Sequence, residues 1–266
     1  MIGNVYEVAR FYCSSSVVSA NGNCYLNESA EEMLVKDIHE QPALSSLASR
    51  LSASALRADA RESGLGHAEL TNVMKALRSQ IWGADYYSNR EKHDAYVPDT
   101  DDLEWLARAK QASDYVKAAH NGFKDSVANP FANLSNEQLA LITYDDSGAF
   151  TLNERQAAAF ETAGRESAWR TGLLARGNEE YSRTGGMKDF YQEIIDNYWT
   201  LSPIERTQYP ADYVSDLQNK MNQPNDPLPV NANPQEMKTL FDILFPPREN
   251  LSENGLVGIG KAAEKS

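Results

Sequence analysis

The stretch Leu134–Phe160 reads LSNEQLALITYDDSGAFTLNERQAAAF. A segment of helical character precedes a short turn at Gly148, and a second helical segment follows the turn. The sequence Asp145–Gly148 favours a chain reversal, because Asp and Ser bond to nearby backbone groups and Gly accepts a positive φ. Two capping boxes, in which Ser or Thr is followed three residues later by Gln or Glu, predict helix starts after Ser135 and Thr151. The stretch therefore predicts a helix–loop–helix unit.

The oxygen-bearing residues of this loop have a spacing typical of calcium sites. Such a loop places oxygen ligands at alternate positions, a glycine at the sixth and a glutamate at the twelfth. With Gly148 at the sixth position, residues 134–161 resemble a degenerate EF-hand. Thr143 departs from the family pattern, because it offers a neutral hydroxyl where the family has a carboxylate. The resemblance implies Ca²⁺ as the only cofactor, with these ligands: Thr143, Asp145, Ser147, the Ala149 carbonyl and Glu154.

A second interpretation of the same residues needs no ion. The turn at Asp145–Gly148 and the capping box of Thr151 and Glu154 account for most of the pattern through backbone hydrogen bonds alone. Both interpretations predict the same two helices. They differ in whether the side chains of Asp145 and Glu154 converge on one centre.

An echo of the loop occurs near the N-terminus. Asn21–Glu28 reads NGNCYLNE and matches Ser147–Glu154 at Gly, Leu, Asn and Glu. If the echo reflects a second, degenerate loop, the two could pair through very short strands at Cys24 and Phe150. Four identities in eight residues can also arise by chance.

The remaining sequence favours a mainly α protein, an irregular multi-helix bundle. Apolar residues recur at helical spacing in 44–61, 67–82, 103–120 and 187–199, and no series of alternating strands is present. Gly164 and Gly172 are candidate interruptions of the helix that follows Leu152. We expect this organisation along the chain: a partly flexible N-terminal segment 1–24, a helical domain 25–222, a Pro-rich linker 223–235, a C-terminal helix 236–247 and a mobile tail 248–266.

The charge balance limits the class of partner. The chain has a formal net charge of −13, which disfavours nucleic-acid phosphates and anionic lipid, since both need clustered Lys and Arg. A protein partner, including a basic one, is compatible with it. Residues 84–98, ADYYSNREKHDAYVP, form a Tyr-rich loop that could contact such a partner. The alternative is a solvent loop whose tyrosines fold back onto the core.

Cellular location follows from what the sequence lacks. It has no apolar run long enough to span a membrane and no conventional secretory signal. We therefore expect a soluble, cytoplasmic protein, with export by a signal-less route left open. Cys13 and Cys24 are expected to be free thiols, although a bridge across the short loop between them is an alternative.

No catalytic motif defines a reaction. The sequence has no P-loop, no Gly-x-Ser-x-Gly elbow and no His-Glu-x-x-His pair. The wording NPF-x-x-L-S-x-E-Q-L at 129–139 resembles bacterial proteins without an assigned activity. Three hypotheses remain: a helical interaction or effector-type protein with a calcium loop, a metal-free binding module or inhibitor of a basic partner, and a hydrolase or transferase whose site is assembled from scattered acids.

Overall fold

The computed structural model describes residues 45–122 and 127–222. The chain divides at Leu44 into two units, and every described helix belongs to the second. The expectations for residues 1–44 and 223–266 therefore lie outside the described residues; these include Cys13, Cys24, the echo at 21–28, the linker, the C-terminal helix and the tail.

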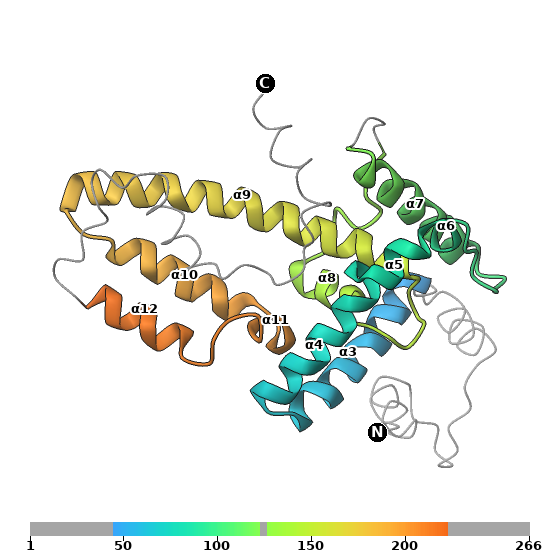
Figure 1. Ribbon diagram of the computed structural model, residues 1–266, viewed down its shortest axis with the longest axis horizontal. Coiled ribbons are helices and arrows are strands. Elements are labelled where there is room, and N and C mark those ends of the chain that lie inside the picture. The colour runs from blue at the N-terminus through green and yellow to red at the C-terminus, as the bar shows by residue number, and fades with distance from the viewer. Residues whose placement is uncertain (1–44, 123–126, 223–266) are drawn as a thin grey trace, which may run out of the picture. The chain divides into compact units, whose positions relative to one another are not determined.

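The described residues confirm the mainly α multi-helix fold and contain no strand (Figure 1). Among these helices, none combines the length and apolar character that crossing a bilayer requires. The helices are α3 (Ser46–Gly64), α4 (His67–Trp82), α5 (Ala84–Ser88), α6 (Arg90–Asp94), α7 (Leu103–His120), α8 (Asn136–Thr143), α9 (Leu152–Thr184), α10 (Lys188–Thr200), α11 (Pro203–Arg206) and α12 (Tyr213–Met221).

Local capping explains where several helices begin. Ser135 and Thr151 each start a helix with the predicted capping box, and Ser202 starts α11 in the same way. The side chain bonds the third amide, while the following Gln or Glu returns a bond. The N-terminus of α3 is capped from another helix. The carboxylate of Glu104 in α7 accepts from the amides of Ser46 at 2.7 Å and Leu47 at 3.0 Å. These bonds fix α3 against α7.

The helix α9 is continuous and serves two hydrophobic clusters. Its first half packs with α3, α7 and α8 around Phe131, Ile142 and Phe160. Its second half packs with α10, which in turn packs on α12, around Leu173 and Ile194 (Figure 1). A third cluster joins α4, α8 and α11.

Glycines within α9 do not interrupt it, although the sequence left that possibility open. Gly164 and Gly172 both lie inside the continuous helix. Gly177 has a packing role, because a Cβ built there would lie 2.5 Å from Cδ2 of Phe190 in α10. The close approach of α9 and α10 at this point requires a residue without a side chain.

The sequence suggested that residues 84–98 form one loop, and the structure differs. Most of them form the short helices α5 and α6, and Tyr86 is buried. The Tyr86 ring stacks on His93, with centroids 5.0 Å apart. Tyr96 is exposed. Thus only part of this segment folds back onto the core.

Candidate functional site

The loop between α8 and α9 reverses the chain through its own side chains. Gly148 has φ 84°, a conformation that favours glycine. Oδ1 of Asp145 accepts from the amide of Ser147 at 2.8 Å and from its hydroxyl at 2.5 Å. The Ser147 hydroxyl also accepts from the Ala149 amide at 3.3 Å. The turn chemistry read from the sequence is therefore present.

Three arginines of α3 donate hydrogen bonds to oxygens of this loop. Arg50, Arg57 and Arg61 are seven and four residues apart, a spacing that places them on one face of a helix. Each donates to a different loop oxygen. The bonds are Arg50 Nη1 to the Ala149 carbonyl at 3.0 Å, Arg57 Nη2 to Asp145 Oδ2 at 2.6 Å, and Arg61 Nη1 to the Tyr144 carbonyl at 2.9 Å.

The carboxylate of Glu154 lies on the other side of the loop and is completely buried. Its Oε1 accepts from Nε of Arg108 at 2.8 Å. Its Oε2 accepts from Nε1 of Trp105 at 3.0 Å and from the amide of Thr151 at 2.8 Å. Glu154 therefore belongs both to the capping box of α9 and, as the anion, to a buried ion pair with α7.

These contacts do not fit a Ca²⁺ site at the five predicted ligands. Oxygens of Asp145, Ala149 and Glu154 each accept a hydrogen bond from a different arginine. Within residues 45–122 and 127–222, no group of three or more His, Cys, Asp or Glu side chains could hold a metal. Calcium binding stays a prediction. In the structure, arginine guanidinium groups already place positive charge at the loop oxygens.

The first turn of α9 is unusual because four consecutive polar residues are buried. Asn153, Glu154, Arg155 and Gln156 are all almost inaccessible to solvent. Consecutive residues of a helix point in different directions, so a polar run of this length must turn at least one side chain toward the core. The polar run could be read from the sequence, but the residues that bond to it could not.

Asn153 and Gln156 form an amide network with α5 and α7. The hydroxyl of Tyr86 lies 2.6 Å from Asn153 Oδ1 and 2.7 Å from Gln156 Oε1. Gln156 donates to the Ile81 carbonyl at 2.7 Å, and His120 Nε2 lies 3.1 Å from its Oε1. Burial raises the pKa of Tyr86, so the phenol stays protonated and remains a donor. Burial lowers the pKa of His120, which favours the neutral imidazole.

Arg155 joins α9 to α4 and α8. It donates to the carbonyls of Thr143 and Leu77, each at 3.1 Å, and to Gln80 Oε1 at 2.6 Å. Burial lowers the pKa of Arg155 to about 10, which still leaves it charged at neutral pH. Its partners are backbone and amide oxygens. This arrangement holds the chain ends of the loop together and offers no general acid or base.

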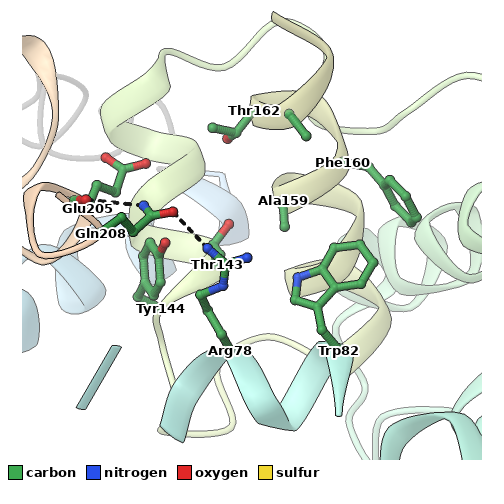
Figure 2. A pocket seen from close by; sticks show the side chains of 10 residues that line it. Arg78, Trp82, Thr143, Tyr144, Ala159, Phe160, Thr162, Glu205 and Gln208 are labelled. Carbon is green, nitrogen blue, oxygen red and sulfur yellow. Dashed lines mark hydrogen bonds between the residues drawn. The ribbon is translucent and has the colours of Figure 1, made fainter. Parts of the chain in front are cut away.

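A small cavity lies among α4, α8, α9 and α11 (Figure 2). Its volume is about 30 Å³, whereas pockets for organic ligands measure roughly 300–1,000 Å³. The cavity is therefore too small for a substrate or an organic cofactor. The enzyme hypothesis gains no support from it.

An exposed surface lies between α6 and α7, on residues 94–104, which we name the acidic–apolar segment. Tyr96, Val97 and Leu103 are 56%, 69% and 79% exposed. The segment contains five acids and no Lys or Arg. Of these acids, Asp99, Asp101 and Glu104 are exposed. Large apolar side chains grouped in this way are typical of contact surfaces.

Comparisons with protein families, with curated proteins and with solved structures find no significant match to the chain.

Proposed function

We propose that residues 45–222 act as a metal-free helical binding module that docks a basic protein partner on the acidic–apolar segment 94–104. The observation that carries the proposal is the exposure of Tyr96, Val97 and Leu103 within eight residues, beside exposed carboxylates. Aromatic and aliphatic anchors supply most of the binding energy in protein interfaces. Charges at the rim steer association and select the partner.

The scaffold behind this segment supports the proposal, because it fixes the C-terminal end of the segment. Asp102 caps α7 by accepting from the Trp105 amide at 3.0 Å. Two residues later, Glu104 caps α3. The Arg50 guanidinium lies 3.5 Å from the centroid of the Trp105 ring. A surface held in its bound conformation loses less conformational entropy on binding.

The charge of the segment defines the partner. Asp99 and Asp101 are exposed, and the structure gives neither an ion pair among the described residues. A partner with Lys or Arg around an apolar patch would pair with them. Binding of this kind weakens as salt rises, because exposed charges are screened beyond about 8 Å at physiological ionic strength.

The test compares two variants as immobilised baits. Replacing Tyr96, Val97 and Leu103 together by Ser removes the anchors, and Leu56→Ser is the matched control, since Leu56 is 72% exposed on α3. We expect a basic protein that binds the wild-type chain and the control and elutes with salt. With that protein purified, the triple variant should bind at least about 100-fold more weakly. Losing only two of the three anchors, at about 1.5 kcal/mol each, already corresponds to that factor.

Two outcomes would contradict the proposal. The first is that no protein distinguishes the triple variant from Leu56→Ser. The second is that binding persists unchanged when salt is raised. Circular dichroism of each bait keeps the comparison valid, because all four side chains are exposed and their replacement should leave the fold intact.

A further inference from the structure

Thr143 lines the cavity among α4, α8, α9 and α11, and its buried hydroxyl has no hydrogen-bond partner among the described residues. The side chain of Thr143 is largely buried, and its Oγ1 accepts and donates no hydrogen bond among the described residues. Such a group costs free energy unless something bonds to it. In native proteins, an ordered water commonly fills this role.

Other polar groups line the same cavity. Arg78 Nη1 donates to Gln208 Oε1 at 2.7 Å, and Gln208 Nε2 donates to the Glu205 carbonyl at 3.1 Å. Figure 2 shows Trp82 and Phe160 on one side of the cavity and Glu205, Gln208 and Tyr144 on the other. The cavity is therefore polar on the side of α11.

One lining carboxyl has spare capacity. Oε2 of Glu205 accepts from the amide and hydroxyl of Ser202, while the structure assigns its Oε1 no bond among the described residues. The carboxamide oxygen of Gln208 has a second lone pair beyond its bond from Arg78. With Thr143 Oγ1, these give up to three partners for an occupant.

The size of the cavity selects the occupant. A water needs at least about 10–15 Å³ of such space and two to four polar partners. At about 30 Å³ the cavity holds one or two waters and nothing larger. We propose that ordered water occupies this cavity and links the Thr143 hydroxyl at the end of α8 to the side chains of Glu205 in α11 and Gln208 just after it. The site is a structural hydration site between helices that are not adjacent in the sequence.

The sign of one stability change tests the proposal. Thr143→Val keeps the shape of the side chain and removes the hydroxyl. If water bridges the hydroxyl, this variant loses a bonded group and its urea midpoint falls. If the hydroxyl is dry and unpaired, the same change removes a buried polar atom and the midpoint rises. Thr162→Val is the control, because the Thr162 hydroxyl lines the cavity but already bonds to the Ala158 carbonyl at 3.2 Å.

A high-resolution crystal structure supplies an independent readout. We expect a water within about 2.7–3.2 Å of Thr143 Oγ1, retained in Thr162→Val and absent in Thr143→Val. An empty cavity in the wild-type chain would overturn the proposal. So would a water that Thr143→Val leaves in place, or a midpoint that rises in Thr143→Val.

Discussion

The ion pair between Arg108 and Glu154 should contribute far more to stability than its surface counterparts. In Arg108→Met the carboxylate of Glu154 keeps its bonds from Trp105 and Thr151 but loses its only cationic partner among the described residues. Glu154 is 0% exposed, so water cannot replace the guanidinium. Removing one partner of a buried pair costs about 3–5 kcal/mol, and we expect a loss within that range.

A matched surface pair sets the comparison. Lys110 and Asp114 lie four residues apart on α7, with their charged atoms 2.5 Å apart and their side chains 77% and 42% exposed. Exposed pairs of this kind contribute about 0.3–0.5 kcal/mol. Lys110→Met should therefore lower the free energy of unfolding by less than a fifth of the loss in Arg108→Met, although the helix and the deleted charge are the same.

The assay is urea unfolding followed by far-ultraviolet circular dichroism, extended to a double-mutant cycle. Glu154→Gln retains the capping box, because Gln also serves at this position. The double variant Arg108→Met with Glu154→Gln has no buried unpaired charge, so its loss should be smaller than the sum of the single losses by about 1–3 kcal/mol. Additive losses, or equal losses in Arg108→Met and Lys110→Met, would refute this reasoning.

Three further predictions concern separate parts of the fold. Calorimetric titration with Ca²⁺ should give no heat, because arginines already bind Asp145 and Glu154; heat that Glu154→Gln abolishes would restore the calcium hypothesis. Gly177→Ala should cost about 1–3 kcal/mol in unfolding experiments by overpacking, whereas Gly164→Ala, which meets nothing within 4 Å, should stabilise by about 0.4–1 kcal/mol. Burial raises the pKa of Glu205 above its usual 4.5, so the contribution of Glu205 to stability falls as pH rises above 4.5. Glu205→Gln should therefore flatten that part of the stability–pH curve, and an unchanged curve would contradict the prediction.

Sequence reasoning succeeded where the cause is local. The helix starts after Ser135 and Thr151 depend on residues three apart, and both were predicted. Helical spacing in 67–82 was also predicted, and the helix ends at Gly83, whose amide bonds to the Ser79 carbonyl. Periodicity and capping act over one or two turns, so a single sequence contains them.

The partners of the central loop could not be predicted from the sequence. Arg57 meets Asp145 across 88 positions, and Arg108 meets Glu154 across 46. Nothing in residue spacing distinguishes oxygens that an ion binds from oxygens that distant arginines bind. The helices α5 and α6 were missed for a related reason, because burial of Tyr86 against α9 outweighs the loop-forming composition of the segment.

The shared use of α9 by two clusters has a consequence for cooperativity. Its 33 residues span about 50 Å at 1.5 Å per residue, and its hydrogen-bonded ladder runs without a break from Phe160 to Leu173. Unfolding of either cluster therefore exposes apolar side chains of the same helix, α9. The amides in the middle turns of α9 should accordingly exchange more slowly than most amides of the described residues. Limited proteolysis should not cleave first in these turns.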